Sequence, residues 1–279
     1  MIKNKETESF FSVKNGLIAV TFLFFILFIL LPIALVFSEA LKKGIWLYFQ
    51  AISDKEAPSA IKTTLLAASI AVPLNTIFGL STAWLMSRFD FRGKTIYNTI
   101  LDIPFAVSPV IAGLMFVLLL GRRSVIGQFL MDQGIKIIFE TPGIIIATLF
   151  ITLPFVAREL IPLMQEQGKE EEEAAISLGA SGLTTFFKIT LPNIKWGLIY
   201  GIILCNARAI GEFGAVSVVS GHIRGKTNTL PLHVEILYNE YQFTAAFAAA
   251  TLLVFIAVIT LIIKNIVERK HKENMKLAE

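Results

Sequence analysis

The sequence has little charge and almost no cysteine. Only 16% of its 279 residues are charged, whereas 55% are hydrophobic, and the mean hydropathy is +0.70. This apolar share exceeds that of an ordinary globular domain, and a soluble fold could not bury so much apolar surface. Cys205 is the single cysteine and lies inside an apolar run, so the chain forms no internal disulfide and has no CxxC metal site. The composition therefore predicts a membrane protein.

The apolar residues form long unbroken runs and do not alternate with polar residues. Lipid offers backbone amides no hydrogen-bond partner, so membrane-spanning segments are helices or closed barrels, and unbroken runs favour helices. We expect an all-α fold, a polytopic transmembrane helical bundle of about six spans. The predicted spans are 17–37, 62–86, 99–120, 142–163, 196–220 and 245–266.

The first apolar run imitates a secretory signal, because Ser38-Glu39-Ala40 resembles a small-x-small cleavage site. A signal peptide has about 7–15 apolar residues in its core, whereas about 20 are needed to cross a bilayer. The run 17–37 has the longer length. We therefore expect an uncleaved membrane anchor.

Lys and Arg are more numerous in the tails and in alternate loops, which predicts the orientation of the chain. We expect both termini in the cytoplasm of a bacterial inner-membrane protein. The predicted organisation is a tail at 1–16, a transmembrane domain at 17–266 and a tail at 267–279. The net charge of +4 arises from basic residues beside apolar spans and not from one stripe, so nucleic acid is not an expected partner, whereas membrane lipid is.

The loop between the fourth and fifth spans, residues 166–196, is patterned in a way that the other loops are not. Residues 169–178 predict a helix whose first turns carry the four glutamates 170–173, which complement the positive end of the helix dipole. Gly179 follows as the terminator. A second, amphipathic helix is expected from Ser181, ahead of Leu191-Pro192 in the first turn of the next span. Its apolar residues, expected to face the membrane core, are Leu183, Phe186, Phe187 and Ile189.

Two interpretations of this helix pair stay open on physical grounds. The small side chains of Ala174 and Ala175 and the glycine turn at Gly179 form a surface that another protein can approach closely, as a docking site requires. The alternative is an interfacial helix pair that only connects two spans.

The loop resembles the EAA loop of bacterial ABC importer permeases. The matching pattern is Glu173-Ala174-Ala175, three residues, Gly179, nine residues, Ile189, one residue and Leu191-Pro192. The resemblance implies the type I importer permease architecture, with residues 164–195 as a coupling loop. It also implies that Glu173, Ala174, Ala175 and Gly179 contact a separate ATPase subunit, so this chain would bind no ATP and need no cofactor.

Residues 221–227 imitate a phosphate-binding loop but do not match it. The motif needs four residues between its glycines, and only three separate Gly221 from Gly225. The segment also follows a predicted membrane helix on the external side, where no strand precedes it. We expect no nucleotide site here.

The fifth span carries two charges one helical turn apart, Arg208 and Glu212. An unpaired charge at mid-membrane costs at least about 2.5–3.5 kcal/mol, so these residues should pair or face water. They belong either to a gate or translocation path, or to an internal salt bridge that orients the helix. Candidate path residues are Asn206, Arg208, Glu212, Ser217 and Ser220.

Residues 207–241 are similar to the corresponding region of sulfate and thiosulfate importer permeases of the W type, and 101–113 are also similar to that family. The resemblance implies a heteromeric importer with a second related permease, two copies of an ATPase and an external sulfate-binding protein. One rival is a permease for molybdate, tungstate or another oxyanion. A rival of another class is a proton-coupled secondary transporter that uses Glu212.

The sequence offers no catalytic or metal site. His222 and His233 lie in the predicted external loop and His271 in the tail, without a carboxylate or thiol cluster at metal-ligand spacing. We expect ordinary surface histidines and no enzyme activity in this chain.

Overall fold

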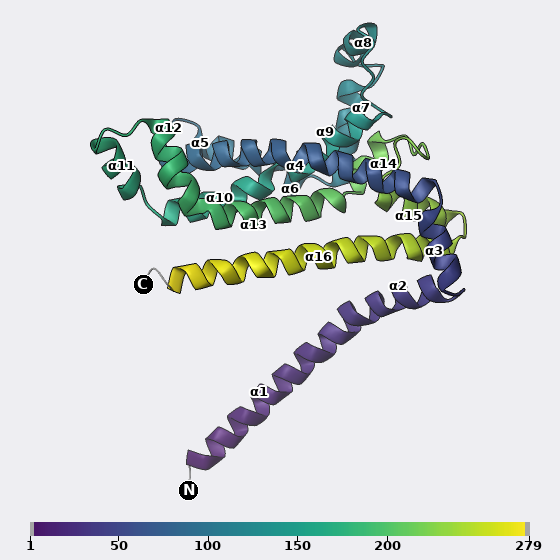
Figure 1. The fold of residues 1–279 in the computed structure, drawn as a ribbon, viewed down its shortest axis with the longest axis horizontal. Coiled ribbons are helices and arrows are strands. Elements are labelled where there is room, and N and C mark those ends of the chain that lie inside the picture. The colour runs from purple at the N-terminus through teal and green to yellow at the C-terminus, as the bar shows by residue number, and fades with distance from the viewer. Residues whose placement is uncertain (1–2, 277–279) are drawn as a thin grey trace.

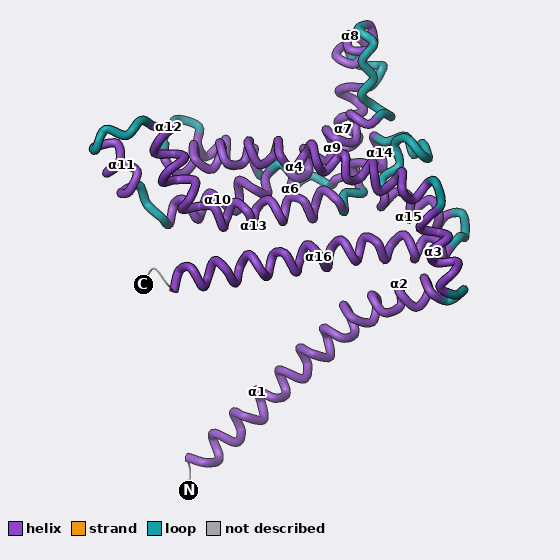
Figure 2. The backbone as a smooth tube through the Cα atoms, viewed as in Figure 1, coloured by secondary structure: helices purple, strands orange, loops and turns teal. Residues whose placement is uncertain are grey.

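The computed structural model describes the backbone of residues 3–276 and the side chains of residues 13–266. Helices and loops make up all of that backbone (Figures 1 and 2). The elements are α1 Lys3–Phe25, the π-helical turn η1 Ile26–Leu30, α2 Leu31–Leu41, α3 Ile45–Ser53, α4 Glu56–Arg88, α5 Lys94–Leu101, α6 Ile103–Ala106, α7 Pro109–Leu120, α8 Val125–Asp132, α9 Thr141–Thr152, α10 Pro154–Glu166, α11 Glu170–Ser177, α12 Gly182–Thr185, the π-helical turn η2 Phe186–Thr190, α13 Leu191–Ile210, α14 Gly214–Val219, α15 Leu230–Asn239 and α16 Phe243–Lys276. The predicted tail 267–279, with His271, lies outside the described side chains, as does much of 1–16.

A compact bundle of α4, α10 and α13 forms the centre of the fold, and α16 packs along α13 (Figure 1). Small residues let these helices approach closely. A Cβ atom on Gly79 of α4 would lie 2.6 Å from the Cβ of Val156 in α10, and one on Gly201 of α13 would lie 3.3 Å from the Val156 Cα. These glycines therefore allow α4, α10 and α13 to pack with their backbones close together.

Within the described part of the chain, four helices are long and apolar enough to cross a membrane, and a bent pair is a fifth candidate. These four confirm the predicted first, second, fourth and sixth spans. Each extends a few residues beyond the predicted bounds, as Val13–Leu41, Glu56–Arg88, Thr141–Glu166 and Phe243–Ile266.

The third predicted span is sharply bent. Lys94–Ala106 and Pro109–Leu120 meet at 106°, so α7 and α8 form a lateral arm that leaves the bundle at nearly a right angle (Figure 1). Pro109 lies in the first turn of α7, where a proline begins a helix but cannot continue one. Arg158 of α10 fixes the segment before the bend, because its Nε and Nη2 donate to the two carboxylate oxygens of Asp102, between α5 and α6.

The prediction of one continuous fifth span over 196–220 is wrong. The helix α13 ends at Ile210, and α14 begins only at Gly214. Glu212 lies within the interruption, where its side chain accepts a hydrogen bond from the Ala215 backbone N–H at 2.9 Å and so caps α14. Gly214 lets α14 lie against α7, since a Cβ here would come within 2.8 Å of the Pro109 side chain.

Two π-helical turns each precede a Leu-Pro pair, at Pro32 and at Pro192. Proline lacks an N–H, and its ring crowds the carbonyl four residues earlier. The wider π turn relieves that crowding and lets the helix continue. Consequently α12, η2 and α13 form one uninterrupted helix, and the expected separate amphipathic helix is a continuation of the fifth span.

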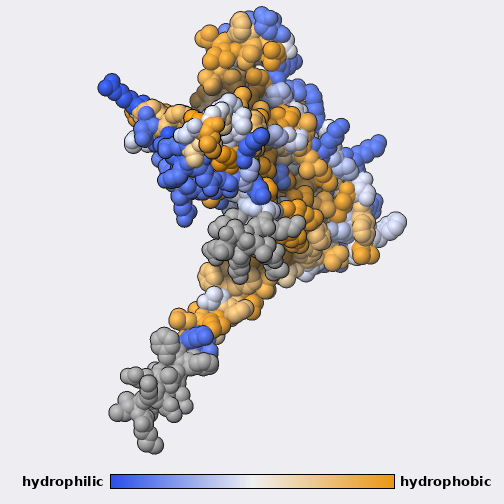
Figure 3. Space-filling model, turned by 60° about the vertical axis from the view of Figure 1, so that its left-hand side comes forward, coloured by the Kyte–Doolittle hydropathy of each residue, from blue (hydrophilic) through white to orange (hydrophobic). Residues whose placement is uncertain are grey.

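Apolar side chains remain exposed over much of the molecule, as expected of a chain that lies in lipid or against partner subunits. The 18-residue apolar window of Val13–Leu41 has no buried residue. Apolar surface also covers the lateral arm at the top of Figure 3, where Leu118 and Val125 are 78% and 85% exposed. Hydrophilic residues gather instead at the end of the bundle that faces the viewer.

The opposite end of the bundle is held by ion pairs of the loop between α14 and α15. Arg224 in this loop pairs with Glu56 in the first turn of α4 and with Glu240 after α15. The expectation of a surface histidine is wrong for His233 in α15, which is only 3% exposed. Burial lowers its pKa, so the ring is neutral near neutral pH.

Gly79 provides a test of the packing between α4 and α10. We expect Gly79→Ala to lower the free energy of unfolding by about 1–3 kcal/mol, because the added methyl group meets the Ala157 backbone N at 2.9 Å, and that backbone cannot move aside. Thermal unfolding of the purified subunit in detergent measures this change. The control Gly16→Ala adds a methyl group in open space and should leave stability nearly unchanged; equal melting temperatures for both variants would contradict the packing argument.

Candidate coupling loop and translocation path

The first helix of the coupling loop is α11, Glu170–Ser177, close to the predicted 169–178. Its carboxyl end closes on Gly179, which has φ +90° and so adopts the left-handed conformation that favours glycine. The Gly179 N–H donates to the Ile176 carbonyl, and the Ala180 N–H donates to the Ala175 carbonyl. The predicted terminator is confirmed as the residue that reverses the chain.

The second helix of the loop begins where the sequence predicts it. The hydroxyl of Ser181 accepts a hydrogen bond from the Thr184 N–H and caps α12. Since α12 continues through η2 into α13, a displacement of this end of the loop acts directly on the long helix.

The residues proposed to meet an ATPase lie on an accessible surface. Glu173, Ala174 and Gly179 are exposed, and Ala175 is half-buried. Four large apolar side chains of the same loop are also exposed. They are Ile176, Leu178, Leu183 and Phe187, at 56%, 90%, 74% and 60% exposure. Exposed apolar residues rimmed by polar ones are typical of a protein interaction site.

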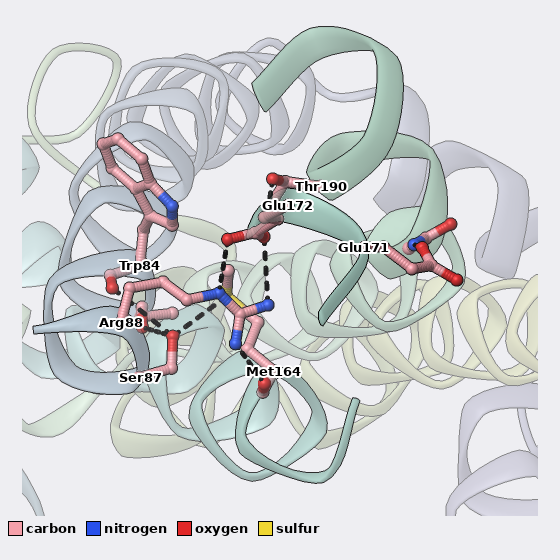
Figure 4. A network of polar contacts seen from close by, with 9 residues as sticks. Trp84, Ser87, Arg88, Met164, Glu171, Glu172 and Thr190 are labelled. Carbon is pink, nitrogen blue, oxygen red and sulfur yellow. Dashed lines mark hydrogen bonds and ion pairs between the residues drawn. The ribbon is translucent and has the colours of Figure 1, made fainter. Parts of the chain in front are cut away.

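A network of polar contacts fastens α11 to the bundle (Figure 4). Glu172 accepts hydrogen bonds from Nε and Nη2 of Arg88, the last residue of α4, at 2.8 and 3.0 Å. The Thr190 hydroxyl donates to the same carboxylate at 2.7 Å, and Arg88 Nη1 donates to the Met164 carbonyl of α10 at 2.6 Å. The side chains of Arg88 and Glu172 are only 8% and 14% exposed. One ion pair therefore joins α4, α10, α11 and η2.

Further contacts surround this pair. Glu171 accepts a hydrogen bond from Asn193 in α13, and the Phe186 ring packs edge-on against Trp84 of α4 with centroids 5.5 Å apart. The sequence interpretation assigned the acidic run to the helix dipole and missed these partners. The available signal was the length of that run, which exceeds what the EAA pattern requires.

Arg208 and Glu212 pair with each other at the break between α13 and α14. Arg208 Nη1 lies 2.6 Å from Glu212 Oε2, and the two side chains are 32% and 1% exposed. Glu212 is thus a buried carboxylate with one charged partner and one backbone donor. The internal salt bridge, which is one of the two interpretations drawn from the sequence, is therefore present. Part of the Arg208 guanidinium also remains accessible.

The other candidate path residues do not converge on this pair. The Ser217 hydroxyl donates to the Gly214 carbonyl, and the buried Ser220 hydroxyl accepts from the His222 N–H. Asn206 is half-buried one turn before the break. Among the residues that the structure describes, His, Cys, Asp and Glu form no group of three or more able to hold a metal ion.

A bundle of long apolar helices, with a polar loop of two short helices at one end, defines the class of integral-membrane transport permeases. The model of the binding-protein-dependent transport system inner membrane component family matches residues 75–272. The chain belongs to this family and is a membrane component of a transport system, not an enzyme.

The chain is similar along most of its length to permeases named for sulfate transport. It is 52% identical to the sulfate transport system permease protein CysW of Synechocystis sp. over 93% of this chain and 94% of that protein. It is 48% identical to CysW of Escherichia coli strain K12, over 90% and 86%, and 35% identical to CysT of Salmonella typhimurium, over 89% and 90%.

The fold is that of a solved ABC transporter. The crystal structure of a bacterial alginate ABC transporter, in complex with an alginate pentasaccharide-bound periplasmic protein, superposes with a TM-score of 0.76 over 92% of this chain and 94% of the matched chain. The sequence identity is 16%, so this likeness concerns the architecture alone. It confirms the predicted permease architecture.

The buried carboxylate of Glu212 makes a test of the Arg208 pair possible. We expect Arg208→Ala to lower the free energy of unfolding by about 3–5 kcal/mol, because it leaves a buried charge without a partner. Glu212→Gln should cost less, since its amide oxygen can still accept from the Ala215 N–H. The double variant Arg208→Ala/Glu212→Gln should be more stable than Arg208→Ala alone, because it no longer buries an unpaired charge. Thermal unfolding in detergent measures this difference. Strictly additive losses would contradict the pairing.

Proposed function

We propose that this chain is a membrane-spanning subunit of an ATP-driven importer of sulfate or thiosulfate. The observation that carries the proposal is the 52% identity, over almost the whole chain, to a permease named for sulfate transport. The segment 207–241, which resembles the W-type permeases, forms the break after α13, the external loop and α15. The distinction from permeases for other oxyanions rests on residues 215–241, which follow the Arg208–Glu212 pair in the chain.

The proposed assembly contains a second, related permease, two copies of an ATPase and an external sulfate-binding protein. Relatives named CysT share 31–35% identity with this chain, which favours a pair of similar permeases. The solved alginate transporter was crystallised with a periplasmic protein, which favours an external partner of that kind. ATP would be bound by the ATPase, and this chain would need no cofactor. Lipid is the remaining partner, and nucleic acid is not one.

The proposed coupling surface is the exposed part of the coupling loop around Glu173, Ala174, Ala175 and Gly179. The beginning of α1, the end of α16 and α11 lie toward the same side in Figure 1, which supports a cytoplasmic location for all three. Closure of the ATPase would press on α11 and α12 and move α13, since α12 and α13 are one continuous helix. The break at Glu212 would allow α13 to move relative to α14.

The proposed path runs beside Arg208, whose partly accessible guanidinium can make transient contacts with an anion while Glu212 holds it in place. Asn206 and Ser217 lie half-exposed on either side of the break, whereas Ser220 is buried and contributes only to the shape of the loop. The proton-coupled rival needs Glu212 to release and bind protons. Its ion pair and its capping bond to Ala215 favour a structural role instead.

Reconstitution tests the substrate and the energy source. We expect proteoliposomes that contain this subunit, a CysT-type permease, the ATPase and the binding protein to take up labelled sulfate only with internal ATP. Uptake of labelled molybdate, measured in parallel, should be lower, and a protonophore should leave sulfate uptake intact. If the proteoliposomes took up molybdate faster than sulfate, molybdate would be the substrate. If uptake collapsed together with the proton gradient, the ATP-driven mechanism would be refuted.

Gly179 tests the coupling surface. We expect Gly179→Leu to abolish sulfate uptake and co-purification of the ATPase while the subunit still inserts, because a side chain at φ +90° distorts the turn and projects from the docking surface. The matched control is Gly93→Leu, at φ +92° and also in open space, in the turn before α5. This control carries the same backbone strain outside the coupling loop, so it should retain both sulfate uptake and co-purification of the ATPase. Normal uptake by Gly179→Leu would refute the assignment.

A further inference from the structure

The helix α11 has few connections to the rest of the protein. Its packing is mainly with α12 and η2, which belong to the same loop. The Arg88–Glu172 ion pair is the contact through which α11 reaches α4, and Arg88 in turn holds the Met164 carbonyl of α10. A force on the exposed face of α11 would therefore reach α13 along the chain and through the Glu171–Asn193 hydrogen bond, whereas Glu172 gives α11 its direct polar contact with Arg88 of α4, which in turn holds α10.

The geometry of this pair suits the transmission of force. Both terminal oxygens of Glu172 are held, one by Arg88 Nε and the other by Arg88 Nη2 and the Thr190 hydroxyl. A two-point contact between a planar guanidinium and a carboxylate fixes orientation as well as distance. The pair is largely shielded from water, so salt screens it far less than a surface ion pair.

Helix α4 extends the connection across the bundle. It runs unbroken for 33 residues from Glu56 to Arg88, about 50 Å at 1.5 Å per residue. Its far end is also held by an arginine, because Glu56 pairs with Arg224 in the external loop. A displacement of Arg88 along α4 would thus act on the loop that follows α14.

We infer that Arg88 and Glu172 are positioning residues that transmit the movement of the coupling loop to α4 and α10, so that the bundle moves together with α13. The inference rests on the proposed function, because it requires an ATPase that moves the loop. Glu172 faces the bundle, whereas Glu173 beside it is exposed, so the two adjacent glutamates have different tasks. Loss of the Arg88–Glu172 pair should uncouple transport from ATP hydrolysis without preventing docking.

The test uses the complete importer in proteoliposomes and measures sulfate imported per ATP hydrolysed. We expect Glu172→Gln and Arg88→Lys to lower this ratio about tenfold, within the usual range of a coupling free energy between sites. The ATPase should still co-purify with both variants. The control Glu170→Gln removes the same charge from an exposed position on α11 and should keep the wild-type ratio.

Charge reversal separates transmission from loop folding. Arg88→Glu and Glu172→Arg should each lower the ratio, and the double variant should recover part of it, because the two charges can pair again. An unchanged ratio in Glu172→Gln, no recovery in the double variant, or loss of the ATPase from the Glu172→Gln complex would each overturn the inference. Wild-type import without any ATPase would instead overturn the proposed function, and this inference with it.

Discussion

The absence of hydrogen-bond partners in lipid is the constraint on which this structure depends. Every break in a helix leaves N–H and C=O groups that the chain itself must satisfy. The break between α13 and α14 does so with Glu212, whose carboxylate accepts from the Ala215 N–H. A carboxylate placed there needs a counter-charge, which Arg208 supplies from one turn earlier. One requirement of the backbone thus explains both charges in the middle of an otherwise apolar segment.

Much of the fold could be predicted because its signals are local. An apolar run long enough to cross a bilayer defines a span without knowledge of its neighbours, which is why four spans were placed within a few residues. The turn at Gly179 and the cap at Ser181 are also local, since each depends on one residue and the few that follow it. The exposure of the EAA residues agrees with the loop inferred from their spacing, although their role stays a proposal.

The parts that sequence reasoning missed depend on partners far apart in the chain. Arg88 and Glu172 are separated by 84 positions, and no spacing rule indicates that they meet. The segment before the bend at α7 is held by Arg158, 56 positions from Asp102, and Pro109 lies against Gly214, more than 100 positions away. At the interruption of the fifth span, Glu212 contacts both Arg208 and the Ala215 backbone, which an apolar run does not reveal. Apolarity alone predicted a straight helix in both places, because it measures the affinity for lipid and not the direction of the backbone.

Three of the arginine–carboxylate pairs among the described residues join segments along the bundle: Arg88–Glu172, Arg158–Asp102 and Arg208–Glu212. They join α4 to the coupling loop, α10 to the segment before the lateral arm, and α13 to α14. Such a pair gains little net stability over apolar packing, whether it is buried or, like Arg158–Asp102, partly exposed, but its fixed geometry restricts how the two segments can meet. Apolar helices that slide over one another have no such restriction. In a chain with so few charges, these arginines fix how neighbouring segments meet, and the Arg88–Glu172 pair is the polar joint between α11 and α4.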